Sequence, residues 1–330
     1  MLISGLFVGL LLGIILQRGQ FCLSGQLRQV AFKRDFTSFS PLLTAISVQS
    51  IGFYLLEQQG VIRFPSSPMP ILATLLGAFL FGIGMGVANR CVSGQLYRAG
   101  EGMIAAMITL FVFGVTTVAT QTGVLKFWVA SQLETESKLI TVPQTLRISS
   151  LWFIIPLSLI ATWGLQKSRK IQPLIPRKPF GQFWSPHFTA ILLGLVSILA
   201  WVLSAETGRE FGLSFSIPVG HALQYLTLGQ QRYLNWGTYL IIGLVLGSFL
   251  SAKFSGNFRW KALSATDFGK SVAGGILMGI GASLTGGCTM ANAVVGTAYF
   301  SWQGWIATIV MMFGVWCVFI LRKNPLESTC

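Results

Sequence analysis

"TLLGAFLFGIGMGVANRCVSG" at residues 74–94 and "SVAGGILMGIGASLTGGCTMA" at residues 271–291 follow the same pattern of apolar residues, glycines and one cysteine. Six positions are identical at an offset of 197: Gly77 with Gly274, Leu80 with Leu277, Gly82 with Gly279, Ile83 with Ile280, Gly84 with Gly281, and Cys91 with Cys288. In both stretches a long apolar run ends at a short loop that carries the cysteine. This pattern is typical of a membrane helix that is broken inside the bilayer.

The composition of the chain is that of an integral membrane protein. Of its 330 residues, 53% are hydrophobic and 10% are charged, and the mean hydropathy is +0.69. A soluble domain has about 25% charged residues. The first apolar run has no basic segment before it and no small-residue cleavage site after it, so we interpret it as a membrane segment rather than a signal peptide.

Nine apolar segments divide the chain and predict an all-α fold. They are 2–16, 40–56, 71–88, 101–120, 151–165, 188–203, 236–252, 271–285 and 301–321. Several are shorter than the roughly 20 residues that span a bilayer. We therefore expect about nine transmembrane segments, with short helices after Cys91 and Cys288 that complete two of the crossings.

The basic residues predict an orientation. With the N-terminus outside, 15 of the 23 Lys and Arg residues fall on the inner side and six on the outer side. Cytoplasmic loops are enriched in Lys and Arg, so we expect the N-terminus in the periplasm and the C-terminus in the cytoplasm. The basic stretch 167–184 is then a cytoplasmic linker, and the polar stretch 121–150 is external.

A second match extends the internal repeat. "FCLS" at 21–24 aligns with "FGLS" at 211–214, which puts Gly212 in the place of Cys22. The halves are about 1–120 and 188–321, joined by 121–187 within a single membrane domain. Because the linker contains one extra crossing, the two repeats have inverted topology. Inverted repeats with broken helices place a substrate site between the halves.

Cys22, Cys91 and Cys288 are the candidate pathway residues because they share this broken-helix setting. Glycines let the backbone bend sharply, and the free N–H groups of a helix that starts at such a loop favour an anion. A protonated thiol adds a weak donor and a polarisable sulfur, which suits a sulfur-containing anion better than sulfate. The helix N-terminus would also lower a thiol pKa, so the sequence leaves the protonation state open.

The remaining composition argues against other chemistries. No CxxC pair and no zinc-ligand spacing occur, and the two histidines are far apart in the sequence, so no metal and no cofactor is predicted. Cys317 is interpreted as a packing residue, and Cys330 receives no role. The net charge of +14 lies in loops between apolar segments and forms no basic-aromatic platform, so no nucleic-acid partner is expected.

Polar residues beside the second loop are candidates for pathway or loop support. Arg90 precedes Cys91 at apparent membrane depth, where an arginine is costly and is usually functional or paired. Glu101 could pair with Arg90, but it is more readily explained as a structural partner of Arg98 or of a loop N–H group. Arg90 could equally face a polar vestibule.

Three further residues flank the other loops. Gln17 and Arg18 are expected to close the first loop by bonding free helix carbonyls, or else to line the pathway directly. Asn292, four residues after Cys288, would lie one turn along the following short helix. It is a plausible polar residue of the pathway.

Together, "QRGQFC" (17–22), "CVSGQLYRAGEG" (91–102), "TGREFGLSF" (207–215), "GGILMGIGASLTGGC" (274–288) and "WQGW" (302–305) make the chain resemble a known family. It is similar to the YeeE/YedE family of bacterial sulfur-transport membrane proteins, and most similar to the YeeE-type thiosulfate transporters. The resemblance covers nearly the whole chain. It implies an hourglass-shaped, pseudo-symmetric helical pathway in the inner membrane that takes up thiosulfate for cysteine synthesis.

The same resemblance implies a mechanism and a partner. Its pathway cysteines correspond to Cys22, Cys91 and Cys288, and the anion would pass by hydrogen bonds from thiol to thiol. A small cytoplasmic TusA-like sulfur carrier would receive the sulfur. Two departures affect selectivity: the second loop reads Asn-Arg-Cys instead of Gly-Gly-Cys, and the third continues as "TMANA".

Other functions stay open at this point. The chain could carry another sulfur or selenium species, or it could be a passive channel for a different small anion. It could also be a membrane sulfurtransferase or a disulfide oxidoreductase, although the absence of CxxC counts against the latter.

Overall fold

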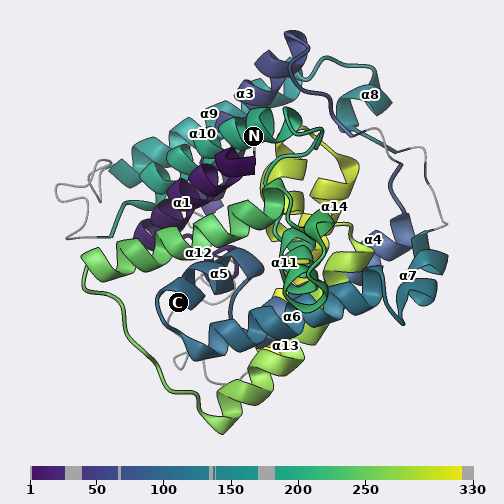
Figure 1. The fold of residues 1–330 in the computed structure, drawn as a ribbon. Coiled ribbons are helices and arrows are strands. Elements are labelled where there is room, and N and C mark those ends of the chain that lie inside the picture. Colours follow the sequence, from purple (N-terminus) through teal and green to yellow (C-terminus); the bar gives the residue numbers. More distant parts are fainter. Residues whose placement is uncertain are drawn as a thin grey trace.

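The chain is almost entirely helical in the computed structural model, which describes residues 2–26, 39–65, 68–133, 137, 139–169 and 183–321 (Figure 1). Within these ranges there is no β-strand, and two isolated bridges join Met103 to Lys261 and Thr141 to Ser301. Much of the basic stretch 167–184, and also Cys330, lie outside the described residues.

Each of the nine predicted segments forms a helix. The helices are α1 (Leu2–Gly19), α3 (Ser40–Gln58), α4 (Ile71–Val87), α6 (Ile104–Gln121), α9 (Leu151–Arg169), α10 (Pro186–Ala205), α12 (Trp236–Phe254), α13 (Ala265–Leu284) and α14 (Trp302–Leu321). In the described part of the chain, six helical stretches, containing α1, α4, α6, α10, α12 and α14, are long and apolar enough to cross a membrane. The protein is therefore an all-α, multi-pass membrane protein.

Shorter helices connect or interrupt the long ones. They are α5 (Val92–Gly100), α7 (Lys126–Leu133), α8 (Val142–Leu146), α11 (Ser216–Leu228), the 3₁₀ turn η2 (Gln231–Tyr233) and the π-helical η3 (Met290–Gly296). The prediction of a short helix after each of the two repeated loops is confirmed by α5 and η3. The sequence did not reveal α7 and α8 within the polar stretch 121–150.

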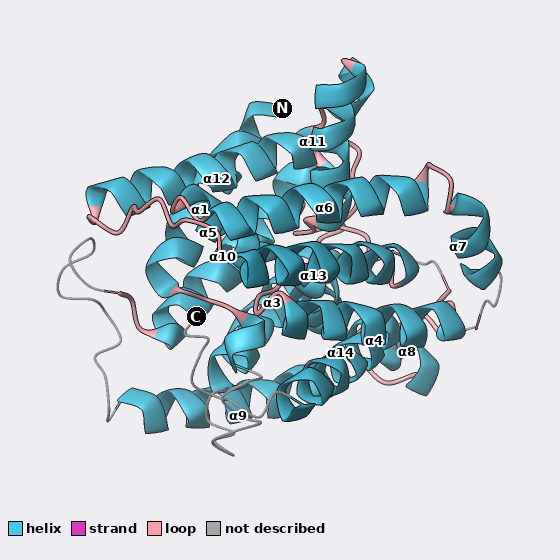
Figure 2. Cartoon of the chain, turned by 90° about the horizontal axis from the view of Figure 1, so that it is seen from below, coloured by secondary structure: helices cyan, strands magenta, loops and turns pink. Residues whose placement is uncertain are grey.

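The long helices pack in two rows. One row runs in the order α12, α1, α10, α3 and α9, and the other in the order α6, α13, α4 and α14 (Figures 1 and 2). Three of the short elements lie between the rows, because α5 contacts α1, α12 and α6, η3 contacts α3 and α14, and α11 contacts α12, α6 and α13. The broken helices thus occupy the seam of the molecule.

Glycine allows the closest packing in the first row. A Cβ atom added at Gly9 of α1 would overlap the carbonyl oxygen of Leu240 in α12, and one added at Gly243 of α12 would overlap the carbonyl oxygen of Leu6. The backbones of α1 and α12 can approach this closely only because both positions lack side chains.

One boundary differs from the prediction in a way that affects the site. Helix α13 begins at Ala265, six residues before the predicted apolar segment, because Ser264 caps it by accepting from the backbone N–H of Asp267 at 3.1 Å. The polar first turns of α13 therefore extend beyond the apolar segment and carry Asp267 and Lys270.

Candidate functional site

The three candidate cysteines share one backbone geometry. Each follows a broken helix, and the residue two positions earlier has a left-handed backbone conformation. The left-handed residues are Gln20, Asn89 and Gly286, with φ angles of 46°, 60° and 67°. Such a residue ends a helix by turning the chain away from its axis. The same turn therefore delivers all three cysteines.

Each cysteine also begins a helix. The carbonyl of Cys22 accepts from the N–H of Gln26 at 3.1 Å, that of Cys91 from Gln95 at 2.9 Å, and that of Cys288 from Asn292 at 3.0 Å. These are the first helical hydrogen bonds, so the thiols lie at helix N-termini. The partial positive charge of a helix N-terminus favours an anion at this position.

The thiols of Cys22 and Cys91 form a pair. Their side chains lie within hydrogen-bonding reach of each other, and Cys91 Sγ is also 3.1 Å from the hydroxyl of Ser93. Gly94 lies beside the pair, since a Cβ atom there would stand 3.4 Å from Cys22 Sγ. Both side chains are buried. The pair is the chemical centre of the site.

The Cys288 thiol has different surroundings. It is buried in the same apolar core as Cys22 and Cys91, but no hydrogen bond to its sulfur is formed by the described residues. Asn292 does not reach toward the thiol: its side-chain amide donates to the carbonyls of Gly287 at 3.1 Å and Cys288 at 3.3 Å. Thr285 holds the same loop by donating to the Gly287 carbonyl at 2.8 Å.

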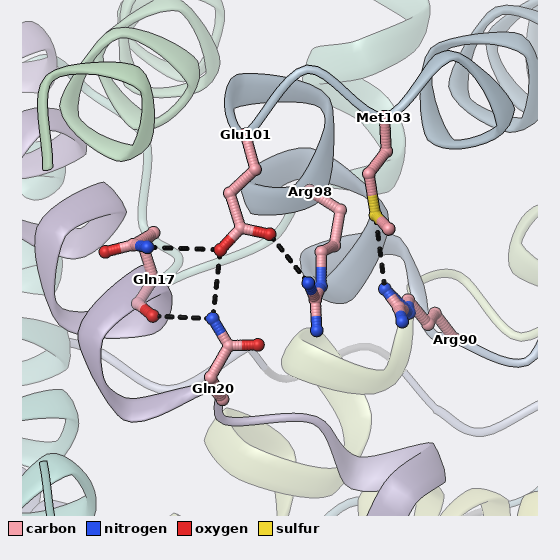
Figure 3. A network of polar contacts seen from close by, with 6 residues as sticks. All are labelled: Gln17, Gln20, Arg90, Arg98, Glu101 and Met103. Atoms are coloured by element: carbon pink, nitrogen blue, oxygen red, sulfur yellow. Dashed lines mark hydrogen bonds and ion pairs between the residues drawn. The ribbon is translucent and has the colours of Figure 1, made fainter. Parts of the chain in front are cut away.

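A buried network holds the first two loops together (Figure 3). Glu101 accepts from the side-chain amides of Gln17 at 3.1 Å and Gln20 at 3.0 Å through one oxygen, and its other oxygen pairs with Arg98 at 2.8 Å. Gln17 in turn accepts from Ser251 at 2.7 Å. Glu101 therefore forms the ion pair with Arg98 that the sequence favoured, and it connects the end of α5 to α1.

Gln20 helps to close the first loop. Its side-chain amide donates to the carbonyl of Gln17 at 2.8 Å. Arg18 is buried, its guanidinium lies 5.5 Å from the centre of the Phe183 ring, and its carbonyl accepts from the N–H of Trp184 at 2.9 Å.

Arg90 lines a cavity of about 160 Å³ where α4 ends and α6 and α13 begin. Its Nη1 atom lies 3.9 Å from the sulfur of Met103, which lines the same cavity (Figure 3). Lys261 and Lys270 are also in its wall. The vestibule alternative considered for Arg90 thus corresponds to an observed cavity.

Sequence reasoning did not select Arg209, although its motif "TGREFGLSF" was recognised. Arg209 lines a cavity of about 270 Å³ with His221 and Asn235, and its guanidinium lies 5.7 Å from the centre of the Trp236 ring. Its Nη1 atom is buried with no hydrogen-bond partner among the described residues. Burial lowers the pKa of Arg209 to about 10, so it remains a cation at neutral pH. The sequence signal that could have pointed to Arg209 was the alignment of its motif with the Cys22 loop in the internal repeat.

The two cavities lie at opposite ends of α12. Asn235 and Trp236, at the start of this helix, line the cavity of Arg209. Lys261, shortly after the end of the helix, lines the cavity of Arg90. A helix of 19 residues is about 28 Å long. A basic cavity is therefore present near each end of the molecule.

Broken helices, buried thiols and basic cavities at both ends define the class of membrane transport proteins for small anions. The family model described as sulphur transport matches residues 18–317, and the chain belongs to this family.

Two relatives match the chain over almost its whole length. It is 38% identical over 328 residues to the thiosulfate transporter TsuA of Escherichia coli (strain K12), covering 96% of this chain and 93% of that protein. It is 29% identical over 328 residues to the thiosulfate transporter TsuA of Spirochaeta thermophila, covering 96% and 97%. A more partial match, 28% identical over 151 residues, is the probable transporter YedE of Salmonella typhimurium, with 41% of this chain and 37% of that protein covered.

Proposed function

We propose that this protein carries thiosulfate into the cytoplasm across the bacterial inner membrane, where it supplies sulfur for cysteine synthesis. The two full-length relatives are thiosulfate transporters, and one shares 38% of the aligned residues. The observation that carries the proposal is the buried pair of thiols of Cys22 and Cys91, each at a helix N-terminus. This arrangement offers both a soft donor and a positive dipole end to a sulfur-containing dianion.

The proposed mechanism is a relay without covalent chemistry. Each protonated thiol of Cys22, Cys91 and Cys288 donates a hydrogen bond to the terminal sulfur of thiosulfate, and the anion moves from one thiol to the next. No bond is made or broken at the substrate. A thiolate would repel the dianion, so the neutral thiol is the active form.

The proposed direction follows the charge distribution. The N-terminus and the cavity of Arg209 face the periplasm, and the cavity of Arg90 faces the cytoplasm, in agreement with the excess of basic residues on that side. The pathway narrows from each cavity toward the thiols, as in an hourglass. Cys22 and Cys91 are the thiols nearest the cytoplasmic end.

The order of helices within the rows supports an inverted repeat. Matching α1 with α10, α3 with α12, α4 with α13 and α6 with α14 makes each row symmetric about its centre: α12, α1, α10, α3 in one and α6, α13, α4, α14 in the other. The residue halves 1–120 and 188–321 thus form two related units around the thiols, with α9 outside the symmetry.

The proposal includes a soluble partner at the cytoplasmic end. The cysteine thiolate of a TusA-like sulfur carrier would attack the terminal sulfur of the incoming thiosulfate, form a persulfide and release sulfite as the S–S bond breaks, and this trapping would favour uptake. Gln17, Arg18, Glu101 and Asn292 support the loops in this proposal, while Arg90 faces the exit.

Uptake by the reconstituted full chain tests the function. Labelled thiosulfate should accumulate in proteoliposomes, with unlabelled thiosulfate competing strongly and sulfate, sulfite and selenite weakly. The Cys91→Ala variant should fold and fail to transport. Equal competition by sulfate would overturn the assignment of substrate, and a stoichiometric persulfide on a pathway cysteine, detected by mass spectrometry, would overturn the relay in favour of a sulfurtransferase.

A further inference from the structure

We propose that the cavity lined by Arg90, Lys261 and Lys270, here called the basic cavity, is an oxyanion-binding site at the cytoplasmic mouth of the pathway. Its direction rests on the proposed function, but its ligand class does not. The site binds the oxygen-bearing end of a small tetrahedral dianion, after or before the sulfur end meets the thiols.

The charge of the cavity wall selects an anion. The described lining residues include three cations and one carboxylate, that of Asp267. Lys261 and Lys270 are exposed, whereas Arg90 is half-buried and Gln95 in the same wall is buried. The site therefore opens to solvent on the lysine side and deepens toward Arg90. An anion that enters from solvent meets the exposed lysines first and the half-buried Arg90 afterwards.

Gly94 lies beside both Arg90 of the cavity wall and the thiol pair. An added Cβ atom at Gly94 would stand 3.3 Å from Cβ of Arg90 and 3.4 Å from Cys22 Sγ. The base of the Arg90 side chain and the Cys22 thiol therefore flank the same residue. From there the guanidinium extends to Met103, in the wall of the cavity.

The chemistry divides recognition between two places. A planar guanidinium binds two oxygens of a tetrahedral anion at once, and each ammonium adds a point charge. These groups recognise oxygens and do not distinguish sulfate from thiosulfate, which differ in one terminal atom. We infer that the basic cavity supplies affinity for the dianion, while the thiols select the terminal sulfur. Sulfate should consequently occupy the basic cavity without crossing.

Exchange in proteoliposomes tests the site from each face. With thiosulfate saturating on one face, labelled thiosulfate is varied on the other, and the half-saturating concentration is measured for each face separately. We expect Arg90→Ala to raise the half-saturating concentration at the cytoplasmic face about tenfold, which is in the range of a charge-assisted hydrogen bond. Lys261→Ala or Lys270→Ala should raise it about threefold, in the range of an exposed ion pair. The periplasmic value should stay unchanged.

Three controls keep the result decisive. Lys253→Ala removes an exposed cation from the last turn of α12 that does not line the cavity, and it should leave both values unchanged. Asp267→Asn removes the carboxylate and should lower the cytoplasmic value about twofold to threefold, a gain that misfolding cannot imitate. Sulfate added on the cytoplasmic face should inhibit wild-type exchange and should inhibit the Lys270→Ala variant less.

The outcomes separate this inference from the proposed function. If the wild-type chain exchanges no thiosulfate, the proposed function fails. The cavity can then still be tested by measuring whether sulfate on the cytoplasmic face competes with the binding of labelled thiosulfate. If the wild-type chain exchanges thiosulfate but the two lysine variants and Asp267→Asn match Lys253→Ala, the oxyanion site is overturned. Should Arg90→Ala fail to fold, the lysine and aspartate variants decide the question.

Discussion

The loops that carry Cys91 and Cys288 have the same backbone and different surroundings. In both, a left-handed residue ends a long helix and the cysteine carbonyl begins a short one. Around Cys91, however, the thiol meets the Cys22 thiol and the hydroxyl of Ser93. The thiol of Cys288 lies in the same apolar core but has no hydrogen bond from the described residues, and the polar groups of its loop bond to the loop backbone instead.

The difference shows that the backbone determines where each thiol lies and that the neighbouring side chains determine its environment. The shared turn brings a thiol to a helix N-terminus in either half of the molecule. The neighbours then determine whether that thiol acts in a pair beside a basic cavity or without a second thiol. A substrate that passes both loops would meet a polarised pair at one and an isolated sulfur at the other.

The largest expected effect separates paired from isolated thiols. Cys22→Ala and Cys91→Ala should each raise the dissociation constant for thiosulfate more than tenfold, and the double variant should bind no more weakly than the weaker single variant. Coupled residues give non-additive effects, and removal of one thiol already destroys the pair. The measurement is a double-mutant cycle on equilibrium binding of labelled thiosulfate to the purified chain, with protein amounts matched.

The Cys91→Ala and Cys288→Ala cycle is the matched control. Because these thiols lie apart, Cys91→Ala should weaken the equilibrium affinity for thiosulfate by the same factor, within about two, whether or not Cys288 is replaced, as expected for independent sites. Multiplicative effects for Cys22 and Cys91 would contradict the pair.

The next effect concerns stability and contrasts the polar groups of the two loops. Glu101→Ala removes the acceptor of Gln17, Gln20 and Arg98 and should cost about 2–3 kcal/mol in the free energy of unfolding. Asn292→Ala removes two bonds to loop carbonyls and should cost about 1 kcal/mol. Unfolding in mixed detergent micelles measures both, with Glu101→Gln expected to recover part of the loss. Equal costs would show that the two loops are held equally strongly.

The arrangement of the fold was largely predictable because membrane helices follow composition. Apolar length and glycine interruptions located all nine long helices, and the repeated cysteine located α5 and η3. The start of α13 was missed because its first turns are polar and depend on the cap at Ser264. Helices α7 and α8 were missed because they lie in a polar stretch without a long apolar run.

The site was predictable in its residues but not in its contacts. The shared context pointed to Cys22, Cys91 and Cys288, and proximity in sequence pointed to the pairing of Arg98 with Glu101. The contact between Cys22 and Cys91 depends on how α1 packs against α5. The basic cavity is formed by residues distant in sequence, which a single sequence does not bring together, whereas for Arg209 the position of its motif in the repeat was the available signal.

A smaller effect is expected from the backbone turn itself. Gly286→Ala places a side chain at a φ of 67° and puts its Cβ atom 3.2 Å from the amide nitrogen of Gln303. The left-handed conformation costs a residue with a side chain about 1–2 kcal/mol. We expect a loss of this size in the free energy of unfolding, with Gly269→Ala, at a helical position without neighbours, as control. No loss at Gly286 would mean that this loop can adopt another turn.

The smallest effect tests whether the two turns are interchangeable. Asn89→Gly gives the Cys91 loop the residue type of the Cys288 loop at the same left-handed position, with a φ of 60°. Asparagine tolerates this conformation better than other residues with side chains, so glycine should change the free energy of unfolding by less than about 0.5 kcal/mol. Uptake should also stay within twofold of wild type, because the carbonyl of Cys91 still begins α5 and the thiol pair is unchanged. A large loss of uptake with normal stability would mean that the Asn89 side chain, which also lines the basic cavity, acts on the substrate and that the two loops differ in more than their thiols.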